Sequence, residues 1–220
     1  MKQLYFFMGG HSILRKHGIH FYFIGLITLT LGIALAVQSQ LGTSPFDALL
    51  VGLFRTFGLS IGSWEVVVGF SMIIGNALME RKRPEFFALI TSVVTGIGID
   101  TWLFIIGDII TPQTWMTQSL CIVFSLFFTG LGIAIYLQSL VAPNPMDRSM
   151  IIVANLTGWG MTASRGLISV ILVIIAFFFD GAIGIGTLAN ALLAGMIIQY
   201  FLPPLEKLRQ KSLAKLRLHA

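Results

Sequence analysis

Long apolar stretches, separated by short polar segments, make up most of this chain. A helix needs about twenty residues to cross the roughly 30 Å hydrocarbon core of a bilayer, and six of the stretches reach or approach that length. In lipid, such a stretch satisfies its backbone hydrogen-bonding groups only as a helix. The pattern therefore predicts six transmembrane helices. They are expected over residues 19–38, 61–80, 86–107, 117–137, 163–180 and 185–203.

Two further apolar segments, residues 45–57 and 145–157, are shorter. A helix of thirteen residues is about 20 Å long, which is too short to cross the membrane easily. Each segment follows a polar, turn-rich stretch, at residues 38–44 and 138–144. The pattern favours two re-entrant half-helices, each of which enters and leaves the membrane on the same side.

The chain also repeats itself at a spacing of one hundred residues. Between residues 31–47 and 131–147, eight of seventeen positions are identical, whereas chance would give roughly one or two in chains this apolar. The identities are Leu31-Gly32-Ile33-Ala34 with Leu131-Gly132-Ile133-Ala134, Gln38-Ser39 with Gln138-Ser139, Pro45 with Pro145, and Asp47 with Asp147. Beyond one skipped residue, a weaker match continues with Leu89, Gly96 and Asp100 against Leu188, Gly195 and Gln199. Such a duplication in a membrane chain is typical of transporters and channels.

The positive charges indicate how the chain crosses the membrane, because short cytoplasmic flanks carry an excess of Lys and Arg. Eleven of the fourteen basic residues lie before the first span, between the second and third, or after the last. Six spans with two re-entrant segments place all three clusters inside, whereas eight full spans would place Arg81-Lys82-Arg83 outside. Each repeat then crosses three times, so the second copy is inverted relative to the first.

The fold expected from these patterns is an all-α polytopic membrane protein in the bacterial inner membrane, with both termini cytoplasmic. Its four parts are an interfacial N-terminus (residues 1–18), two membrane repeats (19–107 and 117–203) and a basic amphipathic tail (204–220). The tail alternates Leu with basic residues, which favours contact with anionic lipids of the inner leaflet rather than with nucleic acid.

Composition supports a membrane protein and narrows the chemistry. Hydrophobic residues make up 56% of the chain and charged residues 10%, which leaves too little polar surface for a soluble globule. The lone Cys121 excludes a disulfide framework and a cysteine metal cluster. The chain has no nucleophile elbow, His-Glu-x-x-His or phosphate-binding loop, so we expect no enzyme activity, cofactor or metal.

The candidate site residues lie where the two short helices are expected to begin. Ser44-Pro45-Phe46-Asp47 and Asn144-Pro145-Met146-Asp147 each give a capping residue, a proline at the first helical position and an acid at the third. Capping alone explains both tetrapeptides. A carboxylate near the membrane midplane is costly, however, and two of them favour a polar cavity that contacts a solute or a proton. The two roles are compatible, since free N–H groups at half-helix ends also bind polar ligands.

Four further polar residues are candidates for the same site. Gln38 and Gln138 line a pathway or form hydrogen bonds between helices. Asp100 lies deep in the third span and faces either the bundle interior or the outer aqueous region. Arg148 follows Asp147 and is placed to neutralise it or to bind an anionic ligand.

Glu65 and Arg165 occupy equivalent positions of the two repeats with opposite charge. Because inverted repeats start these spans on opposite faces, the two are not expected to pair. We expect Glu65 to meet Arg55 outside and Arg165 to face inner groups such as Asp147.

The segment Gln38-Ser39-x-Leu41-Gly42-Thr43-Ser44-Pro45-x-Asp47, followed by Gly58 to Gly62 and Arg81 to Pro84, resembles the YczE/YyaS/YitT-like family of bacterial integral membrane proteins. The resemblance extends over nearly all of the chain, although the second copy of the segment departs from it with Ala142-Pro143-Asn144. It implies a membrane location and no particular substrate.

The hypothesis that follows is a small-solute transporter with a site at the repeat interface near the bilayer midplane. Ser44, Asp47, Asn144 and Asp147 would form the site, and Gln38, Gln138, Asp100 and Arg148 would complete it. A passive channel is the nearest alternative. A non-transporting accessory or scaffold protein, acting through its basic tail, is the alternative from another class, and a homo-oligomer is compatible with each.

Overall fold

The computed structural model describes residues 12–139 and 144–217 of the chain, and within them it is all-helical. Side chains are described for residues 18–139 and 144–211. The eight α-helices are α1 (Ser12–Ser39), α2 (Pro45–Phe57), α3 (Ile61–Glu80), α4 (Phe87–Ile106), α5 (Trp115–Tyr136), α6 (Pro145–Thr157), α7 (Met161–Phe178) and α8 (Ile185–Arg217). A 3-10 turn, η2 (Leu137–Ser139), follows α5.

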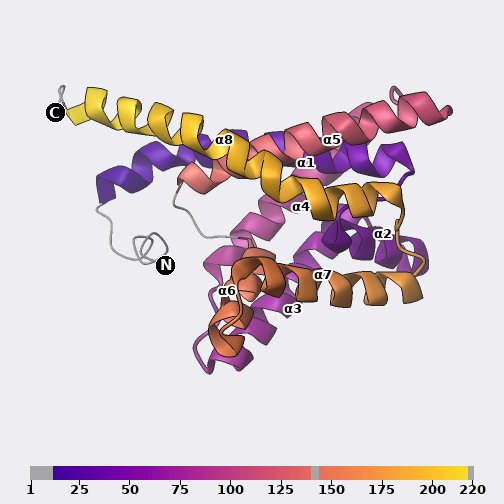
Figure 1. Ribbon diagram of the computed structural model, residues 1–220, viewed down its shortest axis with the longest axis horizontal. Helices are drawn as coiled ribbons and strands as arrows, with labels where there is room; N and C mark the ends of the chain where they lie inside the picture. The colour runs from indigo at the N-terminus through magenta and orange to yellow at the C-terminus, as the bar shows by residue number, and fades with distance from the viewer. Residues whose placement is uncertain (1–11, 140–143, 218–220) are drawn as a thin grey trace.

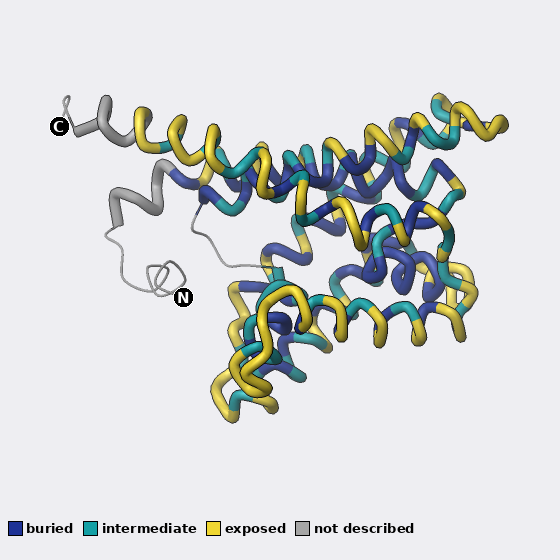
Figure 2. Tube along the Cα trace, viewed as in Figure 1, coloured by how far each residue is buried: buried dark blue, intermediate teal, exposed yellow. Residues whose placement is uncertain are grey.

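Six of these helices are long and apolar enough to cross a membrane, as the sequence predicts. They are α1 from Gly18, α3, α4, α5 continued through η2, α7 and α8. Large apolar side chains are exposed along them, and Phe104 and Phe178 are 87% and 79% exposed. Figure 2 shows exposed positions alternating with buried ones along the outer helices. Surfaces of this kind suit contact with lipid rather than water.

The two short helices begin and end where the sequence predicts, because each boundary has a local signal. The Ser44 hydroxyl accepts a hydrogen bond from the Asp47 amide at 3.3 Å, and the Asn144 side chain accepts one from the Met146 amide at 3.0 Å. Proline occupies the first position of both helices, where its missing N–H costs nothing. Gly58 and Gly158 end them at φ values of 76° and 73°, which favour glycine.

The helices form two layers, with α1, α5 and α8 in one and α2, α3, α6 and α7 in the other (Figure 1). Helix α4 packs against both α1 and α3 and connects the layers. The packing is reciprocal across the repeat. Helix α2 packs on α7 and α6 packs on α3, while α1 contacts α4 and α5 contacts α8. Each half of the chain therefore buries its short helix against the other half.

Helices α1 and α5 have the most extensive contact of any two helices described, and glycines of the repeated Leu-Gly-Ile-Ala segment let them approach closely. A Cβ atom added to Gly132 would lie 2.4 Å from the Leu29 amide nitrogen. One added to Gly32 would lie 2.5 Å from the Thr129 amide nitrogen. Small residues let membrane helices approach this closely, so the repeated segment forms the contact between the halves.

The segment before α2 is held by backbone hydrogen bonds to the loop between α7 and α8. The Thr43 amide donates to the Ala182 carbonyl at 3.0 Å, and the Gly186 amide donates to the Leu41 carbonyl at 2.8 Å. We refer to residues 41–43 and 182–186 as the backbone clamp. It fixes the start of α2 without using side-chain chemistry.

The described part of the tail is a continuation of the last long helix and not a separate surface helix. Helix α8 continues from the last span to Arg217, through Pro203 and Pro204. The basic residues of the tail therefore extend directly from a helix that is long and apolar enough to cross a membrane. The expected interfacial N-terminus, residues 1–18, lies mostly outside the described residues.

Candidate functional site

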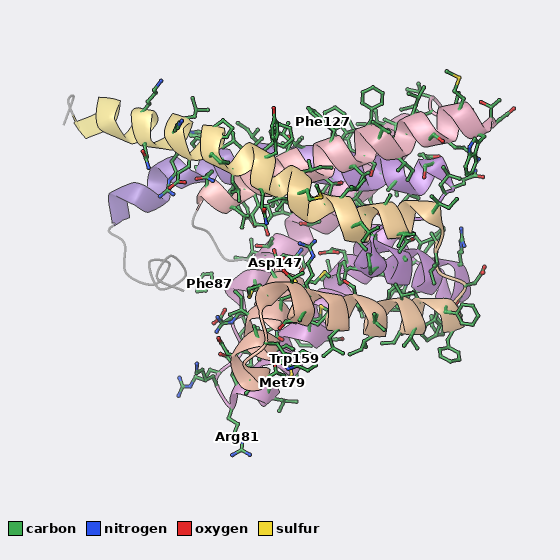
Figure 3. All side chains as sticks on the ribbon, viewed as in Figure 1. Met79, Arg81, Phe87, Phe127, Asp147 and Trp159 are labelled. Atoms are coloured by element: carbon green, nitrogen blue, oxygen red, sulfur yellow. The ribbon has the colours of Figure 1, made fainter. Side chains whose placement is uncertain are left out.

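A cavity of about 90 Å³ lies between the two layers, and all eight helices of the described chain contribute to its wall. One water molecule needs about 10–15 Å³ by this measure, so the space holds several waters or a small solute. Figure 3 shows Asp147, one of its lining residues, in the middle of the molecule. The polar and charged side chains of the wall are Ser44, Asp47, Glu65, Thr95, Thr129, Tyr136, Asn144, Asp147, Arg165, Ser169 and Asn190.

Many lining residues are equivalent positions of the two repeats. The pairs at the hundred-residue spacing are Leu29 and Thr129, Ile33 and Ile133, Ser44 and Asn144, Phe46 and Met146, Asp47 and Asp147, and Glu65 and Arg165. Thr95 and Ala194 are also equivalent positions, because the later part of the repeat aligns once one residue is skipped. Both copies of the sequence therefore supply the wall at matching places.

Two carboxyl groups of the cavity wall interact with each other. Asp47 is 7% exposed, and the Ser44 hydroxyl donates to its Oδ2 at 2.6 Å. Glu65 is 1% exposed and lies near enough to Asp47 to interact with it electrostatically. Its Oε1 has no hydrogen-bond partner among the described residues. No basic side chain of the described wall forms an ion pair with either carboxyl group.

The third carboxyl group of the wall, that of Asp147, has partners. The Tyr136 hydroxyl donates a short hydrogen bond to Asp147 Oδ2. Arg165 lies near enough to both side chains to interact with them electrostatically, so the Asp147 carboxylate faces a positive charge. The expectation that Arg165 faces Asp147 is confirmed.

Four of the eight predicted site residues line the cavity: Ser44, Asp47, Asn144 and Asp147. Gln38, Gln138 and Asp100 are not among its lining residues. Asp100 instead accepts hydrogen bonds from the Ser60 hydroxyl at 2.5 Å and the Gly62 amide at 2.8 Å. It therefore stabilises the N-terminus of α3 from the neighbouring α4.

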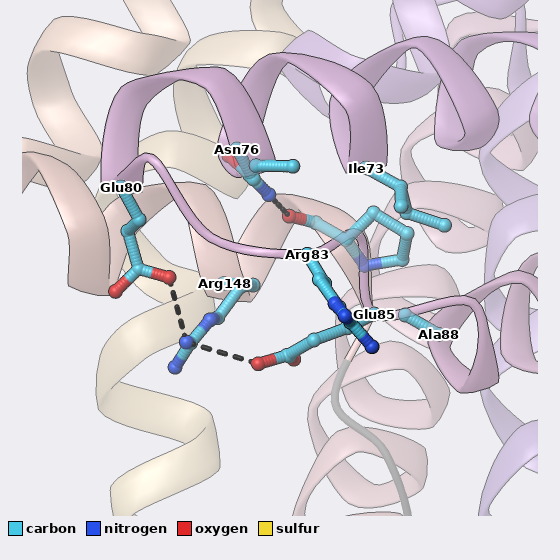
Figure 4. Close-up of a pocket in the computed structure, with 9 residues that line it drawn as sticks. Ile73, Asn76, Glu80, Arg83, Glu85, Ala88 and Arg148 are labelled. Carbon is cyan, nitrogen blue, oxygen red and sulfur yellow. Dashed lines mark hydrogen bonds and ion pairs between the residues drawn. The ribbon is translucent and has the colours of Figure 1, made fainter.

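Arg148 also lies away from this cavity, in a second, smaller pocket (Figure 4). Its Nη2 lies 2.8 Å from Glu80 Oε2 and 3.0 Å from Glu85 Oε1. Adjacent helical residues point in directions about 100° apart, so Arg148 cannot share the direction of Asp147. We call Arg148, Glu80 and Glu85 the ion cluster. It ties the start of α6 to the connection between α3 and α4.

The sequence placed Glu65 outside, next to Arg55, and that expectation is wrong. Arg55 Nη1 lies 2.8 Å from the Asp180 carbonyl and 3.8 Å from its Oδ2. Glu65 turns into the cavity, one turn inside the start of α3.

Sequence reasoning also left Tyr136 and Asn190 out of the site. One signal for Glu65 and Arg165 was available, since an ionisable side chain within a membrane span is a functional candidate by default. Tyr136 had no such signal, because tyrosines near span ends usually act as interfacial anchors. Among the described residues, no group of three His, Cys, Asp or Glu side chains is arranged to hold a metal ion.

The ion cluster gives a prediction about stability. Replacing Arg148 with methionine keeps the apolar stem and leaves two carboxylates without their shared partner. We expect the free energy of unfolding to fall by about 1–2 kcal/mol, because the Arg148 and Glu80 side chains are only 25% and 18% exposed. Denaturant unfolding of the purified protein measures the change.

Arg55→Met is the matched control, because the side chains of its ion pair are 47% and 89% exposed. It should cost no more than about 0.5 kcal/mol. Equal losses from the two variants would contradict a special role for the ion cluster.

Three comparisons relate the chain to known proteins. A family described as "Family of unknown function (DUF6198)" matches residues 16–203. The chain is 44% identical to the "Uncharacterized protein YyaS" of Bacillus subtilis over 187 residues. This alignment covers 85% of this chain and 93% of that protein. The chain is 34% identical over 199 residues to the "Uncharacterized membrane protein YczE" of the same organism, covering 89% and 90%. An "Uncharacterized protein" of Haemophilus influenzae is 27% identical over 180 residues, covering 80% and 79%. No solved structure matches the chain.

Proposed function

The chain belongs to the DUF6198 family, with relatives that include YyaS and the membrane protein YczE, and we propose that this member of the family is a small-solute transporter. The central cavity is its substrate site. One observation carries the proposal: a cavity with four charged side chains, lined by all eight described helices of a chain with six apolar candidate spans. Ionisable groups inside a membrane protein are costly, and they usually mark a solute or ion pathway.

The proposed architecture is a pair of inverted repeats that meet at the cavity. Reciprocal packing supports it, since α2 lies on α7 and α6 lies on α3. So does the supply of lining residues from equivalent positions. Helices α1 and α5 run in opposite directions in Figure 1, as inverted repeats require. In this proposal α2 and α6 are re-entrant half-helices whose N-terminal ends face the solute.

The proposed orientation places the ion cluster inside and the backbone clamp outside. Arg81 follows α3 at the end of the molecule where α4 begins (Figure 3). Asp108 and Asp180 lie in the loops at the other ends of α4 and α7. Positive charge inside then gives an inner-membrane protein with cytoplasmic termini, whose tail contacts anionic lipids. No enzyme activity is proposed.

Uptake into proteoliposomes tests the proposal. The purified protein is offered a panel of labelled amines, amino acids, carboxylic acids and sugars, and we expect saturable uptake and counterflow for at least one class. Asp47→Asn and Asp147→Asn should each reduce that uptake at least tenfold in a folded protein, because each removes a charge from the cavity wall. Asp180→Asn, in an exposed loop, is the matched control and should leave uptake unchanged.

The alternatives predict other results. A passive channel would conduct without saturation or counterflow. If the folded protein moves no solute of the panel, the transporter proposal fails, and an accessory role of the tail becomes the stronger hypothesis.

A further inference from the structure

The distribution of charge in the cavity is uneven, and this limits which solutes it can bind. The described wall holds the carboxyl groups of Asp47, Glu65 and Asp147 and one basic side chain, Arg165. If all four are ionised, their formal charges sum to three negative and one positive, a net charge of −2. Arg165 faces Asp147 on one side, so the excess negative charge lies at Asp47 and Glu65.

Glu65 is the carboxyl group of the described wall that has a buried oxygen without a hydrogen-bond partner. Its side chain is 1% exposed, lines the cavity, and has an Oε1 with no hydrogen-bond partner among the described residues. Asp47, by contrast, accepts from the Ser44 hydroxyl. Two carboxylates that interact in a low-dielectric site disfavour each other's ionised form unless a positive charge lies near them. The pair therefore favours either a shared proton or a bound cation.

The rest of the wall indicates what kind of cation fits. Apolar side chains line the same cavity as the acidic pair, among them Leu29, Ile33 and Phe46. A metal ion prefers a shell of several oxygen or nitrogen ligands, and the described residues contain no group of three His, Cys, Asp or Glu side chains that could supply it. A small organic cation has an apolar body for these side chains and a positive group for the carboxylates. Aromatic residues such as Phe46 and Tyr136 also suit an organic ammonium group.

From these observations we infer that the Asp47–Glu65 pair is the subsite for the positive group of a small organic ammonium compound, which competes with a proton for the same two carboxylates. The inference rests on the proposed transport function and names its substrate class. Binding of the ammonium group would release the proton that the pair shares. One positive charge then replaces another, and the net charge of the cavity stays the same. The other titratable or charged groups of the described cavity are Tyr136, Asp147 and Arg165, which interact with one another.

Ligand binding to the full-length protein in lipid nanodiscs tests the inference. The probes are n-butylammonium, n-butyramide and n-butyrate, which share a short carbon chain and differ in charge. We expect saturable thermal stabilisation by n-butylammonium alone. Its apparent Kd should rise as the pH is lowered, because protons then occupy the carboxylate pair.

Glu65→Gln keeps the size of the side chain and removes its charge, and it should raise the apparent Kd for n-butylammonium at least tenfold and weaken the pH dependence. Asp47→Asn should act in the same direction. Glu206→Gln, an exposed position of α8, is the matched control and should bind as the unchanged protein does.

Several results would overturn the inference: stabilisation by n-butyrate or n-butyramide instead, no stabilisation by any probe, or unchanged n-butylammonium binding in both cavity variants. The uptake panel decides the transport proposal separately. Saturable uptake of an anionic or neutral solute would support transport and contradict a cation subsite. Glu65-dependent binding of n-butylammonium without any flux would support the subsite and contradict transport.

Discussion

Replacing Gly132 with valine is expected to prevent the protein from reaching a stable fold. A Cβ atom at this position would lie 2.4 Å from the Leu29 amide nitrogen and 2.6 Å from the Leu29 Cα atom. Both are backbone atoms, so no side chain can rotate away, and α1 and α5 must separate. This pair has the most extensive contact of any two helices in the molecule. Ordinary overpacking costs about 1–3 kcal/mol, and a forced separation along this contact should exceed about 3 kcal/mol, a large part of a typical total stability.

Size-exclusion chromatography and denaturant unfolding of the purified variants measure the effect. Gly132→Ala should already destabilise, whereas Gly166→Ala is the matched control, since nothing lies within 4 Å of a Cβ atom there. At Gly166 the alanine should be neutral or stabilising by up to about 1 kcal/mol, because glycine weakens helices. Equal stability of the two alanine variants would show that the close contact of α1 and α5 is wrongly placed.

Removing the positive charge at Arg165 is expected to destabilise the folded protein by about 2–4 kcal/mol. Arg165→Gln leaves the Asp147 carboxylate without its facing cation and leaves three carboxyl groups in the described cavity wall. Removing the one positive charge that interacts with a desolvated carboxylate is costly, because the carboxylate then has no nearby cation. The loss should be largest near neutral pH and smaller in acid, since protonation of Asp147 removes the uncompensated charge.

A double-mutant cycle separates this electrostatic effect from a loss of packing. Asp147→Asn with Arg165→Gln should cost less than Arg165→Gln alone, because both charges are then absent. The Tyr136 hydroxyl keeps an acceptor in asparagine. If the two costs simply add, with no dependence on pH, Arg165 acts on stability through packing alone.

The sequence predicted the helices well because their signals are local. Length and apolarity define the six candidate spans, and the observed bounds lie within a few residues of the expected ones, except that α1 begins at Ser12 and α8 continues to Arg217. The bounds of α2 and α6 depend on a capping residue, a proline and a glycine, all visible in the sequence. Ser44, Asp47, Asn144 and Asp147 follow from the same signals, since the cavity lies where both short helices begin.

The remaining cavity residues depend on how helices rotate and pack, which no local signal gives. Glu65 lies one turn inside α3, and whether it faces the outer surface or the cavity is decided by the packing of α3 against α4 and α6. Arg148 is next to Asp147 in sequence, yet the helical turn directs it to Glu80 and Glu85. Tyr136 reaches Asp147 across the connection between α5 and α6.

The reciprocal packing of the two halves also determines when the protein can fold during synthesis. Helix α1 needs α5, and α2 needs α7, so the first hundred residues cannot complete their own packing. At about 5–20 residues per second, the ribosome takes roughly 5–20 s to make the next hundred. During that interval the glycine-lined surface of α1 lies open to lipid or to other nascent chains. Most of the native helix contacts therefore form late and over long sequence separations, which is the condition for slow assembly.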